Sequence, residues 1–305
     1  GLDVRSYNSA LLNEPWEIEK NAGGPFKVFT PYWRHTTKTT RPRDPYPRPR
    51  KIQSPKSWPK SLPIDDLELF PKLDWWKGLD EAWDVGEKNA TKRLELFLEE
   101  MATGYGNSRN RPDQDGTSRM SPHLHFGEIS PQRIWEKAHD MYGDGGKVPS
   151  SIYKFLAELG WREFAYHLLY HFPYMLKAPI NERFKDFPWE KDQEGLRRWQ
   201  EGQTGFPIVD AGMRQLYETG WMHNRVRMIV GSFLVKDLRV HWLEGARWFW
   251  DTLVDADLAS NTMGWQWVAG CGADAAPYFR VFNPMTQGER FDPKGLYTRK
   301  FCPEL

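Results

Sequence analysis

The chain has 305 residues, enough for one large domain or two modest ones with a sizeable core. Its net charge of +1 excludes a global basic field, so any contact with nucleic acid must come from a local patch. Aromatic residues make up 15% of the chain, with 16 tryptophans, which argues against disorder despite a mean hydropathy of −0.72.

Cysteine usage and hydropathy indicate an intracellular protein. Cys271 and Cys302 form neither a CxxC pair nor a zinc-binding spacing, which fits a reduced compartment. No apolar run approaches the about 18 residues of a membrane span, so we expect a cytoplasmic protein without membrane attachment. The stretch HLLYH, His167 to His171, lacks the glutamate of HExxH, and no metal is expected.

The first 63 residues predict little regular structure. From Gly1 to about Phe29 the composition is mixed. Eight prolines then lie between Pro31 and Pro63, spread among basic residues. Because proline at that density is incompatible with helix and sheet interiors, we expect an extended basic linker. A solvated connector and an arm that contacts the backbone of a nucleic acid both fit this pattern.

Beyond residue 70 the apolar pattern is helical. Leu94, Phe97, Leu98 and Met101 have the i, i+3, i+4, i+7 spacing of a helix that stops near Gly104. Spacing and boundary signals predict further helices at about 150–159, 209–220, 221–233 and 243–253. Since no strand pattern and no internal repeat appear, the expected fold is all-α.

Two segments combine groups that bind anions and planar rings. DGTSRMSP, which begins at Asp115, places hydroxyls and backbone N–H groups at a helix start and forms an anion cradle. By itself, a Ser or Thr helix cap explains that stretch better. Further on, Glu158, Trp161 and Arg162 lie at i, i+3, i+4, so a carboxylate, an indole and a guanidinium share one helix face. Charged groups facing a core are unusual unless they bind something.

Two later segments repeat this mixture of polar and aromatic groups. The stretch WMHNRVRM places Asn224 and Met228 one turn apart, with Arg227 beside them. The stretch from Asp255 to Trp267 holds two carboxylates, an amide and two indoles within 13 positions. Such a cluster is unlike an ordinary core helix.

Together these stretches resemble the DNA photolyase/cryptochrome family, and most closely its class I cyclobutane pyrimidine dimer photolyases. The blocks that carry the resemblance occur in family order and cover roughly 105–292: DGTSRMSPHLHFGEISP, ELGWREF, TGFPIVDAGMRQL, TGWMHNRVRM, DADLASNTMGWQW and DAAPYFRVFNPMTQGERFD. The resemblance implies the multi-helix FAD-binding domain of this family, preceded by the extended linker.

The resemblance also implies a non-covalent FAD, folded into a U within the helical domain. The positions that match those holding its phosphates and ribityl chain are Tyr105, Thr117, Ser118, Arg119, Met120 and Ser121. Asn261 would face N5 of the isoalloxazine ring, in a group with Arg227, Asp255 and Asp257. Other matching cofactor positions are Phe155, Glu158, Arg162 and Asn224. Arg227 paired with Asp255 would tune the local field at the reduced ring.

Three tryptophans match the chain that passes electrons inward from the surface in this family, namely Trp265, Trp242 and Trp189. Core packing would explain each of them alone. Their separations from one another match the family, which favours electron transfer.

Photolyases are among the enzymes that take their target base out of the stack. The resemblance implies that Trp161 and Trp267 wall the cavity for a flipped dimer and that Met228 fills a gap. Its expected catalytic residues are Glu158, Asn224 and Asn261. The expected DNA contacts are Glu158, Trp161, Arg162, Asn224, Arg225, Met228, Trp267 and Gln287. The (6-4) branch of the family resembles a His-His pair where this chain has His223-Asn224, which counts against that branch.

The resemblance divides the chain into three parts. Residues 1–15 would be the tail of an otherwise missing N-terminal α/β antenna domain, 16–86 an interdomain linker that is basic and Pro-rich at 31–63, and 87–305 the helical FAD-binding and DNA-binding domain. Because the chain starts with Gly1 and the resemblance implies further C-terminal helices after Leu305, we expect a fragment. An antenna chromophore of a full-length protein cannot be assigned from these residues.

We therefore expect a deoxyribodipyrimidine photo-lyase, a carbon-carbon lyase that acts as a monomer on DNA containing pyrimidine dimers. Light would drive electron transfer from excited reduced FAD to a flipped-out cyclobutane dimer. A cryptochrome-type blue-light photoreceptor is the main alternative, since it would share the flavin and the tryptophans without needing the dimer-binding set. A (6-4) photolyase and a bare DNA-binding fragment are the remaining alternatives.

Overall fold

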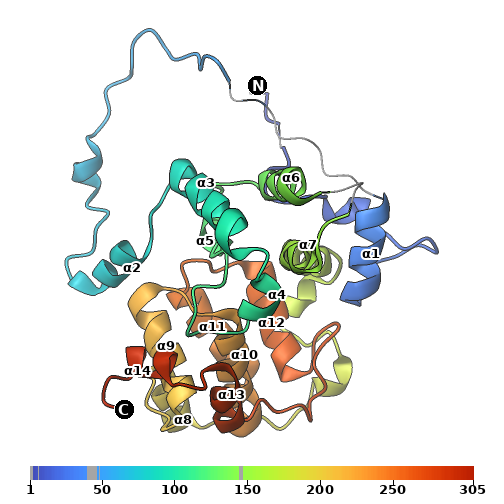
Figure 1. The fold of residues 1–305 in the computed structure, drawn as a ribbon, viewed down its shortest axis with the longest axis vertical. Coiled ribbons are helices and arrows are strands. Elements are labelled where there is room, and N and C mark those ends of the chain that lie inside the picture. The colour runs from blue at the N-terminus through green and yellow to red at the C-terminus, as the bar shows by residue number, and fades with distance from the viewer. Residues whose placement is uncertain (1–2, 6, 40–46, 48, 144–146) are drawn as a thin grey trace.

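The computed structural model describes residues 3–5, 7–39, 47, 49–143 and 147–305 (Figure 1). Its α-helices are α1 (Phe29–Thr39), α2 (Lys77–Ala82), α3 (Glu87–Leu96), α4 (Tyr105–Ser108), α5 (Ser121–His125), α6 (Pro131–Tyr142), α7 (Ser150–His171), α8 (Gln193–Gln200), α9 (Pro207–Thr219), α10 (Asn224–Ser232), α11 (Trp242–Thr252), α12 (Leu258–Ala269), α13 (Pro284–Phe291) and α14 (Leu296–Phe301). Short 3-10 helices cover Pro15–Glu17, Ile64–Leu67, Asp74–Trp76, Pro173–Leu176 and Glu182–Phe184. Single π-helical turns follow α3 at Phe97–Met101 and α10 at Phe233–Asp237. Within the described ranges there is no β-sheet, only a bridge between Glu190 and Val240, and the all-α prediction is confirmed.

The predicted helix boundaries follow local signals. Helix α9 begins with Pro207, whose missing N–H costs nothing in a first turn, and ends before Gly220, which adopts a left-handed φ of 65°. The predicted helix at 221–233 starts later, at Asn224, because His223 Nδ1 accepts a hydrogen bond from the Arg225 N–H and caps the helix there. The helix predicted at 243–253 is confirmed as α11.

The predicted extended segment is wrong for residues 31–39, which belong to helix α1. Pro31 lies in the first turn, where the ring and the lost N–H are tolerated, and the next proline is Pro42. The remainder of the Pro-rich stretch agrees better with the prediction, since residues 49–63 are irregular and exposed. Residues 40–46 and 48 of that stretch lie outside the described residues.

Helix α1 packs directly on α7. A Cβ at Gly160 of α7 would lie 2.5 Å from the indole of Trp33, so only glycine permits this approach. Tyr32 and Trp33 are buried, and Leu12 and Ile18 join the same core cluster. Residues 11–39 therefore pack with the helical body, and the division of the chain at residue 87 stays a prediction.

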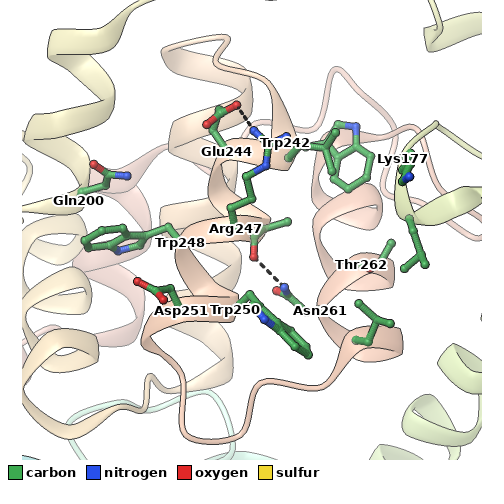
Figure 2. Close-up of a pocket in the computed structure, with 14 residues that line it drawn as sticks. Lys177, Gln200, Trp242, Glu244, Arg247, Trp248, Trp250, Asp251, Asn261 and Thr262 are labelled. Atoms are coloured by element: carbon green, nitrogen blue, oxygen red, sulfur yellow. Dashed lines mark hydrogen bonds and ion pairs between the residues drawn. The ribbon is translucent and has the colours of Figure 1, made fainter. Parts of the chain in front are cut away.

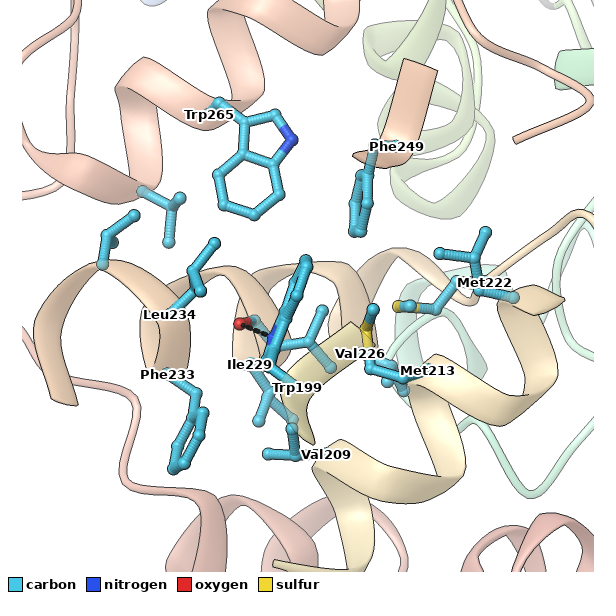
Figure 3. Packing of buried hydrophobic residues seen from close by; sticks show 14 of the residues in the cluster. Trp199, Val209, Met213, Met222, Val226, Ile229, Phe233, Leu234, Phe249 and Trp265 are labelled. Carbon is cyan, nitrogen blue, oxygen red and sulfur yellow. Dashed lines mark hydrogen bonds between the residues drawn. The ribbon is translucent and has the colours of Figure 1, made fainter. Parts of the chain in front are cut away.

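The described residues form two hydrophobic clusters. The first joins α1, α3, α6 and α7, in the upper half of Figure 1. The second joins α8 to α12 and α14, and Figure 3 shows its centre, where Trp199 lies among Val209, Ile229 and Phe249. Trp199 also donates a hydrogen bond from Nε1 to the Val230 carbonyl at 3.0 Å. Helices α7 and α12 pack against each other where the two clusters meet, and the predicted site residues lie around this junction.

Candidate functional site

A partly buried ion pair connects α10 with the segment before α12. Arg227 Nη2 donates to Asp255 Oδ2 at 2.8 Å, and Arg227 Nε donates to the Met222 carbonyl at 2.8 Å. The Asp255 side chain is 3% exposed, and its Oδ1 is buried without a hydrogen-bond partner. Because a buried carboxylate oxygen without a donor is costly, this atom fits a ligand that brings an N–H group, as a flavin ring does.

Asp257 connects α12 with α7 through its two carboxylate oxygens. Its Oδ1 caps α12 by accepting the Ser260 N–H at 2.7 Å, and its Oδ2 accepts the phenol of Tyr166 on α7. One turn later on α12, Asn261 donates from Nδ2 to the Ala246 carbonyl of α11 at 2.8 Å. The amide oxygen of Asn261 is therefore turned away from α11 and is available as an acceptor.

Asn261 and Trp242 also line a pocket of ≈ 860 Å³ along α11 (Figure 2). Its other walls include Trp250 and Asp251 of α11 and Lys177, which follows the 3-10 helix Pro173–Leu176. Most of the predicted cofactor and DNA residues lie elsewhere, so this pocket alone does not define the site.

The three residues predicted to share one face of α7 have separate partners. Glu158 pairs with Arg109 Nη1 at 2.7 Å, and burial raises the pKa of its carboxyl group against the opposing effect of Arg109. Trp161 stacks on Phe29 of α1, with ring centroids 3.7 Å apart. Arg162 donates to the Ala10 carbonyl, and its side chain is 15% exposed. Because this guanidinium already has a partner within the chain, its contacts with DNA and cofactor stay predictions.

Tyr105 and Phe155 form an aromatic wall beside Glu158. Both are buried, and their rings meet edge to face with centroids 5.9 Å apart. Burial, reinforced by the Glu158 carboxylate, raises the pKa of the Tyr105 phenol, which therefore stays protonated. Arg109 lies over the Tyr105 ring, 5.5 Å from its centroid.

Cations border the predicted phosphate loop. Arg93 of α3 donates to the carbonyls of Thr117 and Ser118, and Arg119 lies over the indole of Trp221 at 5.2 Å. Arg119 has a left-handed φ of 52°, which turns the loop sharply before Met120, itself buried. Ser121 is the first residue of α5, as the predicted helix start requires, although α5 spans only five residues.

Four arginines from three segments converge on His223. The pKa of this imidazole falls to about 4, first through burial and then through Arg225, Arg227, Arg119 and Arg109. The His223 imidazole is therefore uncharged at pH 7. Such a concentration of guanidinium groups around a neutral ring favours an anionic ligand. Arg109 was not predicted from the sequence, although it lies one helical turn after Tyr105.

A basic rim continues from Arg225. Its guanidinium donates to Asn110 Oδ1 at 2.8 Å and lies 4.5 Å from the centroid of the Phe291 ring. Burial lowers the pKa of Arg225, and so do the charges of Arg109, Arg290 and Arg280. Arg280 and Arg290 carry no spacing signal in the sequence and were not predicted as site residues. We call Arg225, Arg280 and Arg290 the basic rim.

The remaining predicted DNA residues lie on neighbouring elements. Asn224 is exposed at the start of α10, and Met228 is half-buried one turn later. Trp267 of α12 lies beside Phe282, with ring centroids 6.3 Å apart. Gln287 is half-buried on α13, which packs against α10.

The predicted tryptophan chain is continuous only in part. The ring of Trp189 lies 5.2 Å from that of His241, which lies 5.6 Å from Trp242. Trp265 instead has Phe249 at 5.0 Å and Trp199 at 6.1 Å as ring neighbours. Trp199 has no place in the predicted chain. Gly245 brings the backbone of α11 under Trp265, because a Cβ there would lie 2.1 Å from the indole.

Comparisons with known proteins identify the family of this chain. The model of the FAD binding domain of DNA photolyase matches residues 155–305, and a DNA photolyase model matches residues 1–50. A deoxyribodipyrimidine photo-lyase of Agrobacterium fabrum is 48% identical over 307 residues, which cover 100% of this chain and 64% of that protein. The chain belongs to the DNA photolyase/cryptochrome family. Cryptochrome-1 of Arabidopsis thaliana is 38% identical and is covered over 46% of its length.

Solved structures give the same result. A bacterial class III photolyase from Agrobacterium tumefaciens superposes with a TM-score of 0.94 at 47% identity, covering 100% of this chain and 63% of that one. A Synechocystis cryptochrome superposes with a TM-score of 0.85 at 31% identity, covering 98% of this chain and 62% of the other. The chain thus spans less than two thirds of these photolyase relatives. The predicted family, the helical fold and FAD as the cofactor are confirmed.

Proposed function

We propose that this chain is the FAD-binding and DNA-binding part of a photolyase that repairs cyclobutane pyrimidine dimers in light. The relatives named deoxyribodipyrimidine photo-lyase support the activity. The likeness to a class III photolyase favours that class over the class I expected from the sequence.

The observation that carries the proposal is a contact between the segments that hold two predicted dimer-binding residues, Glu158 and Asn224. Arg225, the residue after Asn224, donates from its guanidinium to Asn110 Oδ1 at 2.8 Å. Arg109, the residue before Asn110, is the ion-pair partner of Glu158 at 2.7 Å. This link between α7 and α10 supports the proposal that Glu158 and Asn224 hydrogen-bond the same base dimer.

Residues around the Arg227–Asp255 pair would hold the cofactor. When bound, FAD supplies the electron that opens the dimer. Asp255 Oδ1 would accept an N–H of the ring system, and the amide oxygen of Asn261 would accept another. Arg119 and the loop from Thr117 to Ser121 would bind the phosphates, where the surrounding guanidinium groups offset negative charge.

Aromatic and basic groups would hold the DNA. Trp161, with one face fixed against Phe29, offers a rigid wall for a flipped pyrimidine pair. Trp267 and Met228 would close the opposite side. The basic rim would bind the phosphates on either side of the lesion, which makes the affinity fall with salt.

The electron path is part of the same proposal. Trp189, His241 and Trp242 lie in ring contact, and Trp265 would complete the path toward the cofactor beside Asn261. We further propose that the protein acts inside the cell as a monomer. Both cysteines are free and buried, which supports a reducing compartment. No helix in the described part of the chain is long and apolar enough to cross a membrane.

The test is repair in light. The FAD-loaded, reduced chain is incubated with an oligonucleotide carrying one thymine dimer, under blue light and in the dark. Loss of the dimer only in the light supports the lyase. A bound flavin without repair contradicts it and favours the photoreceptor alternative.

A further inference from the structure

A short loop separates two of the predicted DNA contacts, Trp267 and Gln287. It runs from Pro277 to Phe282 and presents Phe279, whose side chain is 86% exposed. The end of the loop is anchored to α10, because the Phe282 N–H donates to Ser232 Oγ at 3.0 Å. Both Ser232 and Phe282 are buried, so the loop has an anchored base and an open tip.

Lys236 holds the rest of this loop. It lies on the π-helical turn Phe233–Asp237, about one turn after Ser232, and is 9% exposed. Its Nζ donates to the Arg280 carbonyl at 2.7 Å and to the Pro277 carbonyl at 3.5 Å. It also lies 5.9 Å from the centroid of the Tyr278 ring. One ammonium group therefore contacts three of the six residues in the loop.

The charge of Lys236 is not explained by an ion pair. Lys236 belongs to none of the ion pairs within 4.0 Å among the described residues, and its hydrogen-bond acceptors are the backbone carbonyls of Pro277 and Arg280. Burying an ammonium group is costly when the neighbouring carboxylate, here Asp237, makes no ion pair with it, so packing alone would favour an apolar side chain at this position. The carbonyls that it binds belong to the segment carrying Arg280, a member of the basic rim.

We propose that Lys236 is a positioning residue for DNA recognition, whose ammonium group clamps the Pro277–Phe282 loop so that Arg280 faces the DNA backbone beside Arg225. The proposal rests on the proposed function, since it assumes that the basic rim binds DNA. The clamp acts on the backbone of Arg280, whose guanidinium lies over the Phe282 ring, 5.3 Å from its centroid.

The clamp predicts a dependence of DNA binding on pH. Burial and the charge of Arg280 lower the pKa of Lys236 to about 8, against the opposing effect of Asp237. Burial raises the pKa of the Tyr278 phenol above its usual 10, so this ring does not titrate in the same interval. Since Lys236 loses its proton as the pH rises through about 8, the affinity for DNA should fall over that interval.

The experiment measures the Kd of the FAD-loaded chain for dimer-containing DNA from pH 6.5 to 9.5. We expect Lys236→Met to weaken binding about tenfold at pH 7, which corresponds to about 1.4 kcal/mol, and to remove the fall around pH 8. Lys236→Arg should keep the affinity of the wild type at pH 7 and retain it at pH 9. Lys191→Met, at an exposed lysine, controls for the loss of one charge.

A second measurement reports on the loop itself. Amide exchange across Pro277–Phe282 should accelerate in Lys236→Met while exchange in α12 and the FAD content stay unchanged. An unchanged Kd, pH profile and exchange rate in Lys236→Met would overturn the clamp. If the wild-type chain fails to bind dimer-containing DNA, the proposed function fails instead, and loop exchange still decides whether Lys236 holds the loop.

Discussion

Replacing Glu158 should separate repair from cofactor binding. The Glu158 carboxylate receives a charge-assisted hydrogen bond from Arg109 at 2.7 Å, and we propose that it faces the base dimer together with Asn224. Hydrogen bonds to charged groups contribute about 1.5–3 kcal/mol. Because 34% of the Glu158 side chain is exposed, water screens it, and we take the low end of that range. About 1.4 kcal/mol corresponds to a tenfold change in rate.

We therefore expect Glu158→Ala to lower the repair yield about tenfold at saturating DNA, with FAD retained. Glu158→Gln, which keeps a hydrogen-bonding group of the same shape, should retain more of the yield. The DNA affinity of Glu158→Ala should fall less than its yield, because Arg109 is then free to bind a phosphate. The assay is single-turnover repair under blue light, with the flavin spectrum as the measure of FAD content. Full repair by Glu158→Ala together with loss of FAD would refute this reasoning and place the residue in the cofactor site alone.

Four further predictions concern the cofactor, the electron path, the substrate wall and the buried carboxyl group of α7. The purified chain should be yellow or blue and release FAD on denaturation, and a colourless folded protein that takes up no FAD would contradict this. Trp265→Phe should block photoreduction of the oxidised flavin but spare repair by chemically reduced enzyme; normal photoreduction would make Trp265 a core residue only. Trp161→Ala should weaken dimer binding by about 1–3 kcal/mol, the typical value of base stacking, and an unchanged Kd would remove Trp161 from the cavity wall. Glu163 is 2% exposed, and burial raises the pKa of its carboxyl group from 4.5 to about 7. Because the folded state then binds more protons than the unfolded state, the free energy of unfolding should fall as the pH rises from about 4.5 to 7. Glu163→Gln should therefore melt above the wild type at pH 8 and lack that pH dependence, and identical melting profiles for the two proteins would contradict it.

Local signals in the sequence predicted the helices well where the pattern was complete. Helix α9 begins at a proline and ends before a glycine with positive φ, and both signals are visible in the sequence. Helix α1 was not predicted, because the eight prolines of 31–63 together indicate an extended segment, although α1 contains only Pro31. A single proline in a first turn is compatible with a helix, and the fit of Trp33 against Gly160 is a tertiary contact that no local pattern contains.

Sequence motifs predicted which residues belong to the site, but not which of them contact each other. Arg227 and Asp255 were both predicted as cofactor residues, and their side chains form a hydrogen bond of 2.8 Å. Glu158, Trp161 and Arg162 were expected to act together because they share one helix face. Each has a different partner, since the neighbours come from α1, α4 and the N-terminal segment, which are distant in sequence. Arg109 and Arg280 were missed for the same reason, because their role depends on the convergence of charges in space.

The most direct test of the account is a competition between two lesions. The FAD-loaded, reduced chain is given equal amounts of two oligonucleotides, one with a cyclobutane thymine dimer and one with a (6-4) photoproduct, under blue light. We predict that the cyclobutane dimer is restored to two thymines in the light and not in the dark, while the (6-4) photoproduct stays intact. Loss of the (6-4) lesion alone, or of neither lesion by a protein with a full complement of FAD, would contradict the central claim.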